Sequence, residues 1–162
     1  MATRIPLVMG SSGLPERLQP SDEITVNTAA TQVRTRTNGN AGNIVKGAPV
    51  YLTGVANTVD KARANAMSTS RVYGLVYDTS IAAGAGGAIA TDGPVVATTT
   101  EWDAVTGQTG GLTAGSMYFL DPATAGKLTT SPTNTQGEVN VLVGEAVSTT
   151  EMALNIAKPI LM

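Results

Sequence analysis

Residues 44–64 read "IVKGAPVYLTGVANTVDKARA", and residues 112–132 repeat much of this phrase as "LTAGSMYFLDPATAGKLTTSP". A phrase that recurs at a fixed offset is typical of a fold built from similar units. The aligned pairs, at an offset of 68 positions, are Gly47 with Gly115, Tyr51 with Phe119, and Leu52 with Leu120. A glycine before the first strand of each unit suits a turn that needs a positive φ.

The similarity continues beyond these phrases. "RVYGLVYD" aligns with "VLVGEAVS", and "AIATDGPVV" aligns more loosely with "ALNIAKPIL". The matched positions are Gly74 with Gly144, and Pro94 with Pro159. A glycine inside a strand marks a bulge or the close approach of a neighbouring backbone. We predict two units, each with the order turn, strand, strand, loop, strand, hairpin, strand, which share one core because neither unit buries its apolar face alone.

Short segments with alternating polarity, separated by Gly, Pro and Asn, predict an all-β fold, a small sandwich or barrel. The predicted strands lie in residues 31–37, 48–53, 71–78, 87–92, 94–99, 116–121, 126–130, 138–147 and 152–157. Residues 23–27 also alternate, with Ile24 and Val26 on one face. The best candidate helix, residues 59–67, is interpreted as the end of a strand followed by a loop or one helical turn.

Composition excludes several classes of function. The 162 residues include no cysteine and no histidine, which removes thiol chemistry, the commonest general base and the commonest metal ligand. The net charge of −2 provides no basic field for nucleic acid. No apolar run approaches the ~20 residues that span a membrane. We expect no enzymatic activity, no cofactor or metal, and no nucleic-acid, membrane or small-molecule partner.

The first residues differ from the rest, and we predict an extended arm over residues 1–22 followed by a β domain over residues 23–162. Pro6, Pro15 and Pro20 prevent a continuous helix or central strand. The apolar anchors of this arm are Ile5, Leu7, Val8, Leu14 and Leu18. The arm either lies on its own domain or reaches a neighbouring subunit or another surface. No signal-peptide core is present because Pro6 and Gly10 interrupt the apolar run, so we expect synthesis in a cytoplasm.

One group of residues raises the alternative of a carbohydrate-binding module or a hydrolase. Glu101 and Asp103 flank Trp102, the only tryptophan, and two carboxylates beside an aromatic ring are typical of glycosidases. In a strand, both carboxylates would share one face. The surrounding segment "TTTEWDAVTGQTGG" is rich in turn residues, so we favour a solvated loop with a partly buried tryptophan.

Two further groups are candidate interface residues. Arg34 and Arg36 form a basic stripe that either binds an acidic partner or is the solvated face of an edge strand. In "RVYGLVYD", Tyr73, Leu75 and Tyr77 add a second apolar face to a strand. Aromatic residues make up only 4% of the chain, so its core is thin and we expect burial against partner subunits.

Residues 45–162 resemble a module of bacteriophage virion proteins, including small capsid decoration (cement) proteins and parts of tail-fibre and baseplate proteins. The resemblance is carried by the glycine before "VYL", the "GLV" strand, the run from the tryptophan to "LTAGSMYFL", and the "GKLTTSP" turn. The opening "IPLVMGSSGLPERLQPSDEI" is similar to the start of phage fibre-type proteins.

The resemblance implies a β-barrel or tulip-like sandwich, commonly a homotrimer, that binds the major capsid protein on the outer surface of the virion and stiffens the shell. It also implies synthesis in the cytoplasm of a host bacterium. A tail-fibre or baseplate component is the alternative that the same motifs leave open.

We predict that the purified protein is an oligomer, most simply a trimer, because its aromatic-poor core gains burial from neighbouring copies. Light scattering at micromolar concentration should give a mass well above the 16.4 kDa of one chain. A monomer at these concentrations would contradict the prediction.

Overall fold

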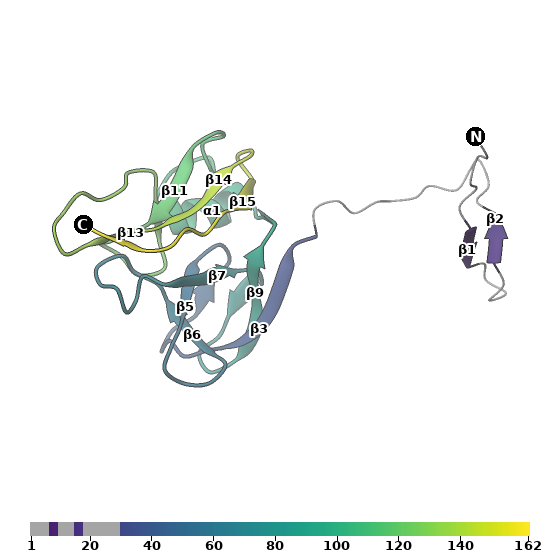
Figure 1. The fold of residues 1–162 in the computed structure, drawn as a ribbon, viewed down its shortest axis with the longest axis horizontal. Helices are drawn as coiled ribbons and strands as arrows, with labels where there is room; N and C mark the ends of the chain where they lie inside the picture. The colour runs from purple at the N-terminus through teal and green to yellow at the C-terminus, as the bar shows by residue number, and fades with distance from the viewer. Residues whose placement is uncertain (1–6, 10–14, 18–29) are drawn as a thin grey trace.

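The computed structural model describes residues 7–9, 15–17 and 30–162, and nearly all of its regular structure is β (Figure 1). The strands are β1 (Leu7–Met9), β2 (Pro15–Arg17), β3 (Gln32–Asn38), β4 (Ile44–Val45), β5 (Pro49–Leu52), β6 (Thr58–Lys61), β7 (Val72–Val76), β8 (Ser80–Ile81), β9 (Gly86–Asp92), β10 (Pro94–Val96), β11 (Met117–Leu120), β12 (Leu128–Thr129), β13 (Val139–Asn140), β14 (Leu142–Ala146), β15 (Glu151–Leu154) and β16 (Ile160–Leu161). The predicted all-β class with a barrel is therefore confirmed.

The first unit is a closed barrel in the order β3-β6-β5-β7-β9. Its neighbouring strands pair antiparallel except β3 and β6, which pair in parallel and close the barrel. This parallel contact involves only Thr37 and Asn38 of β3, paired with Thr58 and Val59 of β6. The closure is therefore limited to the C-terminal end of β3.

The second unit is an open sheet in the order β10-β15-β14-β11-β12. Read from the other end, it has the strand order of the barrel, with β12, β11, β14, β15 and β10 in the places of β6, β5, β7, β9 and β3. The predicted pair of similar units is confirmed. Each unit also begins with a strand, β3 in the first and β10 in the second, and the sequence alignment did not match these two strands with each other. No pairing joins β10 to β12, so the second unit remains open.

The match extends to an irregularity in strand pairing. β5 and β7 shift register between Val50, opposite Gly74, and Tyr51, opposite Val72. β11 and β14 shift register at the equivalent place, with Tyr118 opposite Gly144 and Phe119 opposite Leu142. One residue is therefore extra in each unit, and the two extra residues are Tyr73 and Val143.

Gly74 and Gly144 are buried beside these bulges, and each meets the neighbouring strand at very short range. A Cβ on Gly74 would lie 2.2 Å from the carbonyl oxygen of Ala90, and one on Gly144 would lie 2.5 Å from that of Ala153. Both predicted reasons for a glycine inside a strand, a bulge and a close backbone approach, are thus confirmed at both positions.

The predicted match of Pro94 with Pro159 is wrong. Pro94 begins β10, which crosses into the second sheet and pairs with β15. Pro159 precedes β16, which pairs with β13 instead. The difference arises because β10 is the leading strand of the second unit and does not end the first.

The expected loop around Trp102 is instead a helix, α1 (Thr99–Thr106), and this prediction was wrong. Thr98 caps the helix, since its side chain accepts from the N–H of Glu101 while the Glu101 carboxylate accepts from the N–H of Thr98. Gly107 ends the helix with a left-handed φ of 68°. The helix follows β10 and packs against β4 and against β12, an end strand of the open second sheet.

The two units share one hydrophobic core, as predicted. A single cluster includes Val50 and Leu75 of the barrel together with Tyr118 and Met152 of the second sheet. Trp102 joins the units, because a Cβ on Gly47 would lie 3.0 Å from its ring. Gly47 itself has a φ of 78° and Gly115 has a φ of 76°, which confirms the predicted turns.

Only part of the predicted arm lies within the described residues. β1 and β2 pair antiparallel, with Val8 opposite Glu16, and Pro15 occupies the first position of its strand, where its missing N–H is tolerated. Among the predicted anchors, Ile5, Leu14 and Leu18 lie outside the described residues. The boundary between arm and domain at residue 22 also lies outside them and stays a prediction.

We predict that Gly74→Ala and Gly144→Ala each lower the free energy of unfolding by about 1–3 kcal/mol, because the new methyl group would overlap a backbone carbonyl. Gly54→Ala is the matched control, since nothing lies within 4 Å of its Cβ position. We expect it to change stability by no more than about 0.5 kcal/mol. Urea unfolding monitored by circular dichroism measures all three, and equal stability of the Gly74→Ala variant and the control would contradict the prediction.

Candidate interaction surface

Trp102 is fully buried and cannot stack on a sugar. Its side chain is 0% exposed, and its indole N–H donates to the carbonyl oxygen of Thr150 at 3.0 Å. The prediction of a partly buried tryptophan underestimated this burial, because α1 presses the ring into the contact between the two units. The carbohydrate hypothesis therefore loses the aromatic platform on which it depended.

The two neighbouring carboxylates bind backbone N–H groups. Glu101 accepts from the N–H of Thr98 at 2.8 Å, and this bond lowers the pKa of Glu101, aided by the Thr98 hydroxyl and the positive charge of Lys46. Asp103 accepts from the N–H groups of Gly110 and Gly111, at 3.1 and 2.7 Å. Glu101 starts the helix and Asp103 holds the loop after it, so both have structural roles.

Other kinds of site find little support in the part of the chain that the structure describes. No group of three or more His, Cys, Asp or Glu side chains there is placed to bind a metal ion. None of the helices described is long and apolar enough to cross a membrane.

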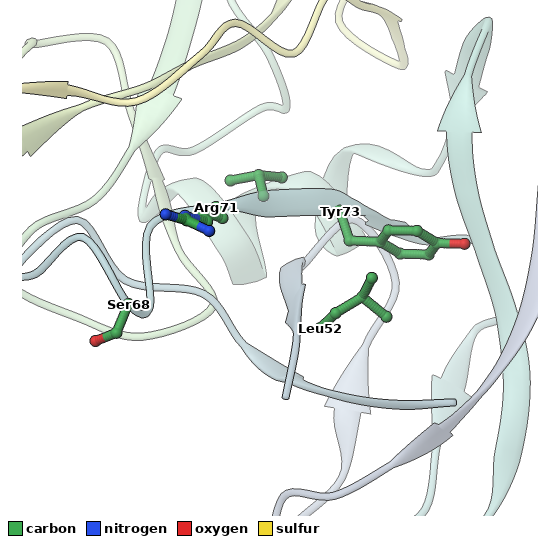
Figure 2. Close-up of a pocket in the computed structure, with 5 residues that line it drawn as sticks. Leu52, Ser68, Arg71 and Tyr73 are labelled. Carbon is green, nitrogen blue, oxygen red and sulfur yellow. The ribbon is translucent and has the colours of Figure 1, made fainter. Parts of the chain in front are cut away.

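Two shallow hollows occur in the described surface. The first, about 360 Å³, lies beside β7 and is lined by Leu52, Ser68, Arg71, Val72 and Tyr73 (Figure 2). In Figure 2, Leu52 lies below the Tyr73 ring, and Arg71 lies just before the start of β7. The second, about 390 Å³, lies between the units and is lined by Lys46, Val96, Ala97, Thr98, Glu101 and Thr150.

Arg36 packs against Tyr73, which brings together two of the predicted interface residues. The guanidinium donates to the Tyr73 hydroxyl at 2.6 Å and lies 5.0 Å from the centre of its ring. Arg34 lies opposite Ile89 of β9, and its side chain is exposed. The interpretation as a solvated strand face is therefore wrong for Arg36, which is half-buried, whereas Arg34 is exposed.

The other two candidates of this segment, Leu75 and Tyr77, lie in different environments. Leu75 is fully buried in the core of its own chain, so its predicted place on an interface is wrong. The bulge at Tyr73 disturbs the alternation of the strand, and Leu75 and Val76 are both covered by the chain itself. Tyr77 is 38% exposed and carries Lys46 over its ring at 5.5 Å.

One exposed apolar surface that sequence analysis missed is the outer face of the second sheet. Val96, Met117 and Val147 are each more than half exposed, at 54%, 55% and 58%. One row across the sheet runs from Pro94 through Ala153 and Glu145 to Met117, and a second joins Val96, Glu151 and Val147. We call this surface the outer sheet face, defined by Val96, Met117, Glu145, Val147, Glu151 and Ala153.

The outer sheet face has a definite chemistry. Its exposed apolar side chains are accompanied by two carboxylates, Glu145 and Glu151, and the rows that define it contain no basic side chain. A surface that alternates exposed apolar side chains with carboxylates in this way suits association with another protein. The signal in the sequence is "SMYFLD", which is apolar at successive positions and so on both faces of its strand, but this pattern does not say which face stays exposed.

No family model matches the chain, and no curated protein matches it.

We predict that the fluorescence of Trp102 is shielded from solvent and unchanged by sugars, because the ring is fully buried and hydrogen-bonded. Acrylamide should quench the native protein only weakly and the urea-unfolded protein strongly. Native emission should also stay constant on addition of common glycans. Quenching of the native protein as strong as that of the unfolded chain, or a saturable response to a glycan, would contradict this assignment.

Proposed function

We propose that the protein is a structural component of a bacteriophage virion, a capsid decoration protein that binds the outer surface of the shell and stabilises it. The observation that carries the proposal is the outer sheet face, an exposed apolar surface on a rigid sheet. The resemblance of residues 45–162 to virion modules supports it. The structural use of Glu101 and Asp103 also favours a binding role over a chemical one.

The proposed role needs only modest contact energy. Burying a side chain that is half exposed contributes about 1 kcal/mol, and the outer sheet face offers three such side chains. Association also costs rotational and translational freedom, so one face alone gives weak binding. A homotrimer that presents three copies of the face to the major capsid protein would bind far more tightly, because the contacts act together.

The two units suit this role mechanically. Their shared core and the buried Trp102 join them into one body, so force applied at one sheet is transmitted to the other. A decoration protein that bridges neighbouring shell subunits stabilises the shell only if it does not deform under the load. The resemblance equally supports a tail-fibre or baseplate component, and the experiment below separates the two locations.

We predict that Met117→Glu and Val147→Glu each weaken binding to capsids about tenfold or more, because each buries a further carboxylate in the contact, beside Glu145 or Glu151. Capsids and tails that lack this protein are incubated separately with the purified chain and sedimented. The proposal expects binding to capsids and none to tails.

Val55→Glu is the matched control, because Val55 is 67% exposed and lies on the turn between β5 and β6, away from the second sheet. It should bind as the natural chain does. Binding to tails alone would replace the proposal with a tail component. Equal binding by all variants would remove the outer sheet face from the contact.

A further inference from the structure

β3 has an edge without a partner strand over most of its length. One edge of β3 pairs with β9 along residues 32–37, whereas the other pairs with β6 only at Thr37 and Asn38. Residues 32–36 therefore have a free edge among the residues that the structure describes. Free edges of regular strands are sites at which another strand adds.

The backbone groups on this edge can be identified. The N–H of Thr37 donates to Asn57 on the β6 side, so by the two-residue period Thr35 and Val33 also point that way. Ala88, which lies opposite Thr35, supports this direction. Its N–H donates to Asp78 and its carbonyl accepts from Tyr77, so neither group bonds to Thr35. The N–H groups and carbonyls of Val33 and Thr35 thus point toward the free edge of β3.

The arginines of β3 occupy the carbonyls of this edge. Arg36 donates to the carbonyl of Thr35 at 2.7 Å, and Arg34 approaches that of Val33 at 3.4 Å. The Arg34 contact is long, and both contacts join neighbouring residues of one strand. A pairing strand would replace them with the hydrogen bonds of a β ladder. The Arg34 guanidinium would then be free for an acidic side chain on that strand, whereas Arg36 stays on Tyr73.

The chain itself contains a segment of matching chemistry, residues 22–27, with the sequence "DEITVN". Its β-branched residues alternate with polar ones, which is typical of a strand. Glu23 supplies a negative charge for the exposed Arg34.

The course of the chain just before β3 favours a second copy over the same copy. Thr31 donates through its hydroxyl to the carbonyl of Pro94 at 2.6 Å. Gly93 lies against the same residues, with its Cβ position 3.0 Å from the carbonyl oxygen of Ala30. The chain therefore runs beside β10 before it enters β3, on the side of β3 that pairs with β9. To reach the free edge of its own β3, the preceding segment would have to cross over β3.

We propose that residues 22–27 of one copy of the protein add as a strand to the free edge of β3 in a neighbouring copy. The five residue steps from position 27 to position 32 span at most roughly 17 Å, so the two β3 strands must lie close to the axis of the assembly. Each copy gives one strand and receives one, which closes a ring when the rotation allows it. This assembly does not depend on capsid binding, because it needs the purified protein alone.

Because the chain has no cysteine, a disulfide can test the contact directly. Chains with Ile24→Cys are coexpressed with chains carrying either Val33→Cys or Thr35→Cys, both at exposed positions, because Ile24 shares the face of Val33 and Thr35 when Glu23 faces Arg34. The proposal expects an oxidised dimer of the two variants with at least one partner position. A coexpressed pair of Ile24→Cys and Val55→Cys chains is the control and should stay monomeric on a denaturing gel.

The double variant with both cysteines in one chain distinguishes the alternatives. A disulfide that forms only within one chain would show that the segment folds back on its own β3, and would overturn the proposal. No disulfide in any combination would overturn it as well. Circular dichroism of each reduced variant confirms that it is folded.

Charge reversal tests the recognition independently. Arg34→Glu should weaken self-association about fivefold in sedimentation experiments, the scale of one exposed ion pair. Glu23→Arg in the same chain should restore it, because each contact then joins the reversed charges. Arg71→Glu, at an exposed arginine away from the edge, should change nothing. Failure of Glu23→Arg to rescue would overturn the pairing of these charges.

Discussion

The close approach of neighbouring strands at Gly74 and Gly144 is the constraint on which the architecture depends. At both places a side chain is excluded because the next strand's carbonyl occupies the space of a Cβ atom. The bulge beside each glycine increases the local bend of the strand, and such bends let a short sheet curve around a small core. Both units have the same strand order because both bend at the same point.

The two units differ at the gap between the two end strands of each sheet. In the first unit β3 reaches β6 and pairs with it in parallel, which closes the barrel. In the second unit α1 lies against β12 next to this gap, and Lys127 of the turn before β12 donates to the carbonyl of Ala104 in the helix. The two units thus share their strand order and differ in their closure. The open second sheet carries the outer sheet face.

The sequence predicted what is local and repeated, and it missed what depends on distant parts of the chain. Strand positions, the paired glycines and the shared core follow from alternation and from the repeat. Helix α1 was missed because its three threonines are weak helix formers, although the capping pair Thr98 and Glu101 was readable. Leu75 was assigned to the wrong environment because a bulge alters the alternation. The exposure of Met117 follows from the open sheet, which no local pattern encodes.

The placement of β10 has a consequence for the synthesis of the chain. β10 ends at residue 96, yet the strand with which it pairs, β15, begins at residue 151. β15 also lies between β10 and β14, so the second sheet is incomplete until residue 154 has left the ribosome. The barrel can form earlier, but the core beneath Trp102 stays open to water until then, since Thr150 and Met152 complete it. Folding of the described domain therefore finishes only after β15 has been made.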